Sequence, residues 1–300
     1  MASWLESFFT PTKIWAARRR LQRYGYIWSN YLKSFKSNEK ARLNFSEEEA
    51  KTKSLENLEE VEMIIGYTFK NRSLLHEAFT HPSYHKDCGS YERLEYVGDS
   101  VLSLLITKEQ FSLYPNLPPG LLTPLRAANV DTEKLARVAV QHNFHRYIRL
   151  GTPILKKQIQ AFIDALPKHP LHSHGLINAP KVLADVVEST VGAVFIDSDC
   201  SVDKTWEVAS DLLKPIITPE MLQTNPVKKL FEICQKYKLK VKLVDLWSEE
   251  GTYKVFVNNQ LKGKGMCREK KDIALNRAAN DAYKEVVRIM TPKNLNNGCS

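Results

Sequence analysis

The chain has 300 residues, of which 43% are hydrophobic, and this is enough for two domains with cores of their own. No apolar stretch approaches the roughly 18 to 20 residues that a membrane-spanning helix needs, so we expect no membrane association. The five cysteines are scattered and never form a C-x-x-C pair. They therefore indicate neither a disulfide framework nor a zinc site, and they favour a reducing, intracellular compartment.

The formal net charge of +9 is unevenly distributed along the chain. Residues 225–300 carry a net charge of +8, whereas residues 51–224 carry −3. A basic end beside a slightly acidic middle is expected if the end contacts phosphate groups and the middle holds cations.

Residues 1–55 form a basic N-terminal extension with Arg18-Arg19-Arg20 and a single acid, Glu6, before residue 38. A basic segment poor in acids is typical of an organelle transit segment. The triple arginine is equally typical of a nuclear-localising or RNA-contacting arm, and a third interpretation is an extra helix packed through its Trp and Tyr side chains. We expect the nucleus or the cytoplasm, with a chloroplast or mitochondrion as the alternative.

Residues 56–219 show helical periodicity throughout and predict a mainly α domain. A helix from about Tyr91 to Tyr114, ended by Pro115, has an apolar run too unbroken for the surface. We expect it to be the central, buried helix of the domain.

Further helices are expected over 121–139, as one helix or a pair, and over 156–165. The proline-rich stretch 167–179 is predicted to be a loop. It contains His169, His172 and His174, which could suggest a metal cluster, but loop histidines in a polar setting usually bind none.

The central helix carries acids on one face. Glu92, Glu95 and Asp99 are spaced at i, i+3 and i+7, so their carboxylates share one side of the helix while its apolar residues share another. Because like charges one turn apart are unfavourable, we expect a cation to sit against this face.

A second acidic pair, Asp185 and Glu188, interrupts an otherwise apolar helical run. Carboxylates are rarely buried unless they are paired or bind a metal. A solvated polar face would explain one such helix, but two on strongly apolar backgrounds favour a shared cation. Oxygen ligands select hard cations such as Mg²⁺.

Both acidic stretches resemble a known family. Glu-Arg-Leu-Glu-Tyr-Val-Gly-Asp at 92–99 resembles the signature of the ribonuclease III family, and Ala-Asp-Val-Val-Glu-Ser at 184–189 resembles its second acidic motif. The similarity extends over roughly 58–219, including segments 78–84, 125–128 and 180–181. Details such as Gly98-Asp99-Ser100 are similar to the plant Dicer-like and ribonuclease III-like branch.

The resemblance implies a ribonuclease III fold and a phosphodiester hydrolase. It assigns Glu95, Asp99, Asp185 and Glu188 to a cluster for Mg²⁺, with Mn²⁺ as a substitute, and it gives catalytic roles to Asp99 and Glu188. It places Glu92 near RNA. With one nuclease domain in the chain, it implies a homodimer that leaves 5′-phosphates and short 3′ overhangs, and no small-molecule cofactor.

After a linker at 220–225, residues 226–291 predict a small α+β domain of order α-β-β-β-α, followed by a tail at 292–300. The expected strands cover 240–246, 252–258 and 260–266. This order resembles a double-stranded RNA-binding domain, a class of module that recognises A-form shape and phosphates.

Within that module, the resemblance assigns RNA contacts to Glu232, Arg268, Lys270 and Lys271. The basic pair sits one residue earlier than in the family pattern, and the loop 247–251 lacks the usual Gly-Pro-x-His, so weak affinity is expected.

The sequence thus predicts a divalent-metal-dependent endoribonuclease that cleaves double-stranded RNA in RNA processing or silencing. The alternative is a double-stranded RNA-binding scaffold with a weak or inactive nuclease fold. The four unsubstituted core acids favour the enzyme.

Overall fold

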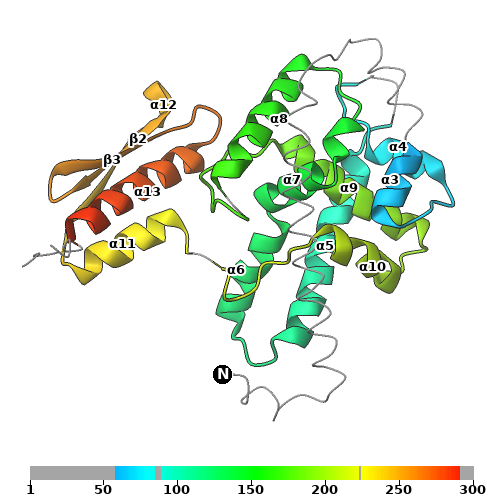
Figure 1. Cartoon of the computed structure of the whole chain (residues 1–300), viewed down its shortest axis with the longest axis horizontal. Helices are drawn as coiled ribbons and strands as arrows, with labels where there is room; N and C mark the ends of the chain where they lie inside the picture. Colours follow the sequence, from blue (N-terminus) through cyan, green and yellow to red (C-terminus); the bar gives the residue numbers. More distant parts are fainter. Residues whose placement is uncertain (1–57, 85–88, 170, 223, 291–300) are drawn as a thin grey trace, which may run out of the picture. The chain divides into compact units, whose positions relative to one another are not determined.

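The computed structural model describes residues 58–84, 89–169, 171–222 and 224–290. They form a helical part, which ends at residue 222, and a C-terminal part, which begins at residue 224 (Figure 1). The expectations for the extension at 1–55 and the tail at 292–300 lie outside these described residues.

The helical part contains only helices and short connections among its described residues. In chain order, the helices are α3 (Leu58–Ile65), α4 (Arg72–Ala78), α5 (Glu92–Leu113), α6 (Pro119–Val130), α7 (Thr132–Gln141), α8 (Pro153–Ala165), α9 (Lys181–Asp197) and α10 (Val202–Leu212), with 3₁₀ turns at Phe144–Arg146 and Leu166–Lys168.

Helix α9 is the centre of this part. It packs against α5, α7, α4 and α10 (Figure 1), and nearly all of its side chains are buried, including both faces of its Val and Ala run. An α-helix that is apolar all round must be enclosed by other elements. The predicted central helix, now α5, is confirmed as a helix, but only one side of it is buried, so it lies beside the centre rather than at it.

The stretch predicted as one helix or a pair at 121–139 is a pair. Asp131 separates α6 from α7 in an extended conformation, and its carboxylate accepts a hydrogen bond from the Lys134 backbone N–H at 2.8 Å. An acid at this position satisfies one of the free N–H groups at a helix start and complements the positive end of the helix dipole.

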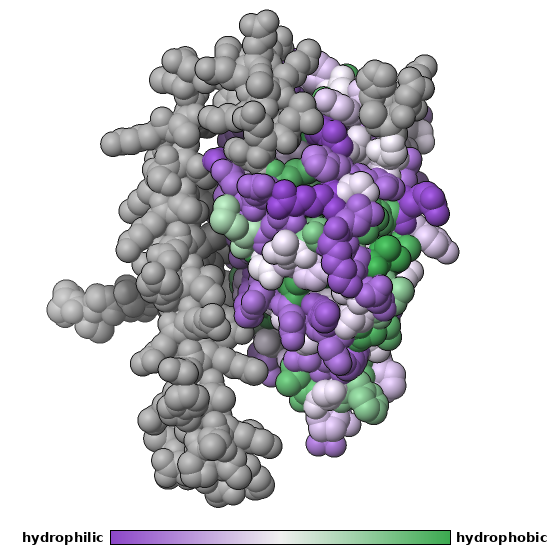
Figure 2. Space-filling model, turned by 90° about the vertical axis from the view of Figure 1, so that its right-hand side faces the viewer, coloured by the Kyte–Doolittle hydropathy of each residue, from purple (hydrophilic) through white to green (hydrophobic). Residues whose placement is uncertain are grey.

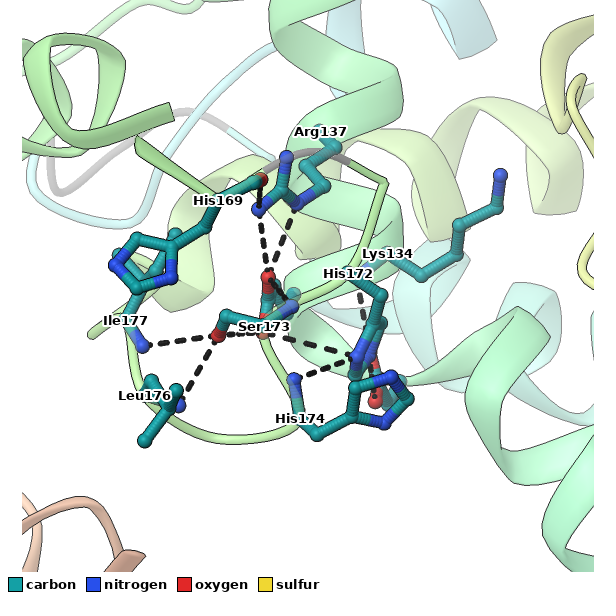
Figure 3. A network of polar contacts seen from close by, with 10 residues as sticks. Lys134, Arg137, His169, His172, Ser173, His174, Leu176 and Ile177 are labelled. Carbon is teal, nitrogen blue, oxygen red and sulfur yellow. Dashed lines mark hydrogen bonds and ion pairs between the residues drawn. The ribbon is translucent and has the colours of Figure 1, made fainter. Parts of the chain in front are cut away.

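The histidine-rich loop is fixed to the start of α7 by a buried polar network (Figure 3). The His172 ring contacts the Asp131 carboxylate at 2.7 Å and accepts a hydrogen bond from the His174 backbone N–H at 2.9 Å. The Ser173 backbone N–H donates to the buried Glu133 carboxylate at 2.6 Å, and Arg137 donates to the same carboxylate at 3.0 Å. The network fastens the loop to the helix.

The C-terminal part follows the predicted order, with one insertion. Its elements are α11 (Pro226–Lys236), β1 (Val241–Leu246), α12 (Trp247–Glu250), β2 (Thr252–Val257), β3 (Gln260–Met266) and α13 (Lys271–Met290). The strands form an antiparallel sheet of order β1-β2-β3. The expectation of a loop at 247–251 was wrong in part, because the short helix α12 occupies most of it.

Helices α11 and α13 cover one face of this sheet (Figure 1). Two glycines of β3 allow the close contact, since a Cβ atom on Gly263 would lie 2.2 Å from the Ala278 carbonyl oxygen and one on Gly265 would lie 2.2 Å from that of Ala274. The backbone of α13 therefore rests directly on β3.

None of the described helices is long and apolar enough to cross a membrane. The side of the helical part that shows α3, α4 and α10 is mostly hydrophilic, with small apolar patches (Figure 2).

Candidate metal centre

The centre is built where α5 crosses α9. A Cβ atom on Gly98 would lie 1.8 Å from the Glu188 carbonyl oxygen, and one on Gly192 would lie 2.1 Å from the Leu94 carbonyl oxygen. The two backbones are therefore in direct contact, with a glycine from each helix at the crossing. Such close approach is possible only where both positions lack a side chain.

This crossing brings carboxylates from the two helices together. Glu95 of α5 and Asp185 and Glu188 of α9 each offer an oxygen atom, and these atoms all lie within 4.8 Å of one another. Asp185 is buried, and Glu95 and Glu188 are partly buried. An all-oxygen set of this kind matches the ligand preference of hard divalent cations.

Asp99, the fourth predicted ligand, is not part of this convergent group. It lies one turn after Glu95 on α5 with an exposed side chain. Its charge nevertheless acts on the centre, because it contributes to the raised pKa of Glu188.

Negative charge at the centre is only partly compensated. Burial, together with the nearby charges of Asp185, Asp99 and Glu95, raises the pKa of Glu188 to about 7. Burial also raises the pKa of Asp185, against the opposing effect of Lys181 and Tyr91. Crowded, partly buried carboxylates of this kind disfavour their own ionised forms, so a bound divalent cation would be stabilised by their charges.

Lys181 is the cation nearest to these carboxylates in the described chain. Its ammonium group donates to a Glu95 carboxylate oxygen at 2.5 Å and to an Asp185 carboxylate oxygen at 2.6 Å. Burial lowers its pKa, but these hydrogen bonds outweigh burial and the net direction is upward. The Tyr91 hydroxyl donates to the other Asp185 oxygen at 2.9 Å and fixes that side chain from the far side.

The sequence predicts a cation against the acidic face, for which Mg²⁺ was named, but Lys181 was not recognised as a partner of these acids. The i, i+4 spacing of Lys181 and Asp185 was a usable signal for their ion pair. The contribution of Tyr91 had no such signal, because 94 positions separate it from Asp185.

None of the predicted RNA-binding residues belongs to the group of three convergent acids. Glu92 is exposed at the start of α5 and accepts a hydrogen bond from Ser90 at 2.9 Å. In the C-terminal part, Glu232, Arg268 and Lys270 are exposed.

Among the predicted basic contacts in the described residues, Lys271 is the one whose charge is paired with a carboxylate. Its ammonium group lies 2.7 Å from an Asp245 carboxylate oxygen and 5.9 Å from the centre of the Tyr253 ring. The Tyr253 hydroxyl donates to the same carboxylate oxygen at 2.7 Å. Lys271, which is predicted to contact phosphate, is thus paired with Asp245 of the same chain.

Comparison with known proteins places the centre in a family. Residues 92–199 match the model described as Ribonuclease III domain. The chain is 46% identical over 226 residues to Ribonuclease 3-like protein 3 of Oryza sativa subsp. japonica. This match covers 74% of this chain and 76% of that protein. It is also 47% identical over 185 residues to Endoribonuclease Dicer homolog 1 of Arabidopsis thaliana. That match covers 59% of this chain but 10% of that protein.

Among solved structures, the nuclease domain of ribonuclease III from Campylobacter jejuni is 26% identical, with a TM-score of 0.43, and the likeness covers 53% of this chain and 98% of that one. The sequence relatives carry the assignment. The chain belongs to the ribonuclease III family, in its plant branch. It is an endoribonuclease, of a family that acts on double-stranded RNA.

Proposed function

We propose that the chain hydrolyses phosphodiester bonds of double-stranded RNA with the help of Mg²⁺, for which Mn²⁺ can substitute. The observation behind this proposal is the convergence of Glu95, Asp185 and Glu188 where α5 crosses the buried helix α9. A structural role for three clustered acids would call for basic partners in equal number, and among the described residues only Lys181 forms ion pairs with them.

Each residue has a distinct task in this proposal. Glu95, Asp185 and Glu188 would hold the cation, and Asp99 would act from the exposed side of the centre. When bound, a divalent cation activates water and stabilises charge on the leaving oxygen. Lys181 and Tyr91 orient the carboxylates through their hydrogen bonds. The expected products carry 5′-phosphates and short 3′ overhangs.

The test is cleavage of a long, perfectly paired RNA duplex with and without Mg²⁺. Glu188→Gln keeps the shape of the side chain and removes its charge, so cleavage should fall by on the order of 100-fold or more while duplex binding remains. Glu207→Gln on α10, at an exposed position, is the matched control and should cleave normally. Near wild-type cleavage by Glu188→Gln would disprove the metal assignment.

The same assay separates the enzyme from the alternative. A wild-type chain that binds the duplex but leaves it intact at all Mg²⁺ and Mn²⁺ concentrations would be a binding scaffold. The paired state of Lys271 speaks against binding as the main activity.

We infer further that two copies of the chain act together. The face of α5 next to its acids exposes Tyr96, Leu104 and Phe111, which are 79%, 53% and 78% accessible. These positions lie on one side of the helix, and a stripe of exposed apolar residues is a common feature of subunit interfaces. A two-fold dimer through this stripe would place two centres on one duplex.

Mixing experiments test the dimer. Wild-type chains mixed with an excess of Asp185→Asn chains should nick one strand of the duplex, because each mixed dimer holds one working centre. If only double-strand cuts appear, in proportion to the wild-type chain, the two copies do not act as a pair.

For the C-terminal part, we propose a double-stranded RNA-binding domain. Its helix and strand order and its net positive charge support this role. Glu232, Arg268 and Lys270 are its expected contacts, and Lys271 joins them only when Asp245 releases it.

A further inference from the structure

The sheet of the C-terminal part has a face that α11 and α13 do not cover. Side chains alternate along a strand, and Tyr253, Val255 and Val257 of β2 are buried beneath the helices. Lys254 and Phe256 therefore point to the opposite face. The described residues place no long helix on that side (Figure 1).

This uncovered face carries like charges directly opposite each other. Lys254 is the cross-strand partner of Lys264, and Val244 stands on the other side of Lys254. Lys242 lies in the next row, opposite Phe256. Like charges at directly paired positions destabilise a sheet, so this arrangement needs compensation from an anion.

The sheet itself supplies no such anion. Asp245 is the only acid within the three strands, and it points toward the covered side, where it pairs with Lys271 and Tyr253. Glu250, the nearest acid before β2, accepts a hydrogen bond from Thr252 at 3.2 Å. Among the described residues, no ion pair reaches the three lysines of the uncovered face.

Apolar side chains are interleaved with these lysines. Phe256 is partly exposed and is paired with Leu261, which is 53% accessible, and Met266 is 58% accessible at the end of the face. A double helix hides the flat surfaces of its bases, so it would offer phosphates to the lysines and nothing to Phe256. An unpaired strand offers both phosphates and base surfaces for stacking.

We propose that this face, defined by Lys242, Lys254, Lys264, Phe256 and Leu261, binds unpaired single-stranded RNA. The lysines contact successive phosphates, and Phe256 stacks on a base. The surface is distinct from the contacts assigned to duplex RNA, which lie on Glu232, Arg268 and Lys270. One C-terminal part can therefore hold a duplex and an adjoining unpaired strand at once.

Fluorescence anisotropy can measure how tightly the full chain binds fluorescein-labelled oligouridylate of about twelve nucleotides. Without divalent cations, this measurement tests the proposal independently of cleavage. The double variant Lys254→Gln with Lys264→Gln should weaken binding about tenfold. The slope of log affinity against log salt concentration should fall by the equivalent of about one to two phosphate contacts. Phe256→Leu, which keeps an apolar side chain, should also weaken binding about tenfold through lost stacking.

A charge-matched control replaces Lys236 and Lys284, exposed on α11 and α13, with glutamine, and it should change binding less than twofold. Thermal unfolding checks the fold, and loss of the Lys254 and Lys264 repulsion should leave the melting temperature unchanged or higher.

Three results would overturn the proposal. Equal losses in the two double variants would mean diffuse charge attraction. In the second result, an unlabelled duplex displaces the oligouridylate, with an affinity that Lys254→Gln and Lys264→Gln lower as much as they lower oligouridylate binding. That result would mean that the face binds paired RNA. Tight binding of polyglutamate at this face without binding of oligouridylate would mean that it docks an acidic protein.

Discussion

The helical part and the C-terminal part hold their functional side chains in opposite ways. In the helical part, the acids project from two helices whose backbones touch at Gly98 and Gly192, so the ligand atoms are fixed by the packing of the domain. In the C-terminal part, the predicted phosphate contacts are exposed side chains. Lys271 is positioned by one ion pair, whose side chains are 52% and 43% accessible.

The difference follows from what each site must do. Ligands of a small cation have to converge within a few ångströms, which requires a rigid backbone. Contacts to phosphate act over longer distances and tolerate mobile side chains. An exposed ion pair contributes at most about 1 kcal/mol, so Lys271 can exchange one partner for another, whereas the acids of the crossing cannot move without separating the helices.

The largest expected effect is at the crossing. Gly98→Ala would place a methyl group 1.8 Å from the Glu188 carbonyl oxygen, and the helices can only move apart. We expect the free energy of unfolding to fall by about 3 kcal/mol or more and cleavage to be lost. Chemical denaturation and the duplex assay measure both effects.

Gly120→Ala is the control for that variant. A Cβ atom at Gly120, near the start of α6, meets nothing within 4 Å, so this change should be neutral or slightly stabilising. If Gly98→Ala melts and cleaves like the wild type, the crossing is not the rigid element that we describe.

The second expected effect is a different response of the two parts to acid. Burial lowers the pKa of His145 to about 4, aided by the charge of Arg146, and its Nδ1 atom is buried without a partner in the described structure. The unfolded chain takes up this proton near pH 6.5. Between pH 6.5 and 4 the unfolded state therefore binds more protons, and stability falls as the pH falls.

The loss from His145 should be on the order of 1 to 2 kcal/mol between pH 7 and pH 5. The described C-terminal part contains no histidine and should show no corresponding loss. Hydrogen exchange read by mass spectrometry, corrected for intrinsic exchange rates, measures the two parts separately. Burial also lowers the pKa of His174 to about 4, so His145→Phe should reduce the acid response of the helical part without abolishing it. An unchanged response would rule out a contribution from His145.

The smallest expected effect is at the C-terminal ion pair. Asp245→Asn releases Lys271, so duplex binding should become a few times tighter at low salt, and the salt dependence should increase by about one phosphate contact. Binding to labelled duplex without divalent cations, over a range of salt concentrations, measures both quantities.

Asp272→Asn removes the same charge from an exposed position on α13 and serves as the control. Equal gains from the two variants would show a general charge effect, and weaker binding by Asp245→Asn would show that the ion pair supports the fold.

These contrasts also explain how far the sequence could predict the site. The spacing of Glu92, Glu95 and Asp99 indicated one acidic face, but periodicity alone cannot tell which of its acids converges with another helix. The structure selects Glu95 and leaves Asp99 exposed, because the crossing at Gly98 and Gly192 sets the angle between the helices. Neither glycine had been recognised as a contact.

The pairing of Lys271 was equally out of reach for sequence reasoning. Asp245 belongs to β1, and it reaches the start of α13 only because that helix rests on β3. The loop histidines show the same limit, because a polar loop with three histidines gave no sign that His172 would be buried against Asp131. Local order was predictable here, whereas partners supplied by tertiary packing were not.

The distance along the chain between the two halves of the centre also sets when activity can arise during synthesis. Glu95 and Lys181 are 86 positions apart, so α5 leaves the ribosome well before α9 exists. A nascent or truncated chain that stops before α9 lacks Asp185 and Glu188 and has no second helix to pack against α5. The carboxylate centre therefore cannot assemble until α9 has been synthesised and has packed against α5.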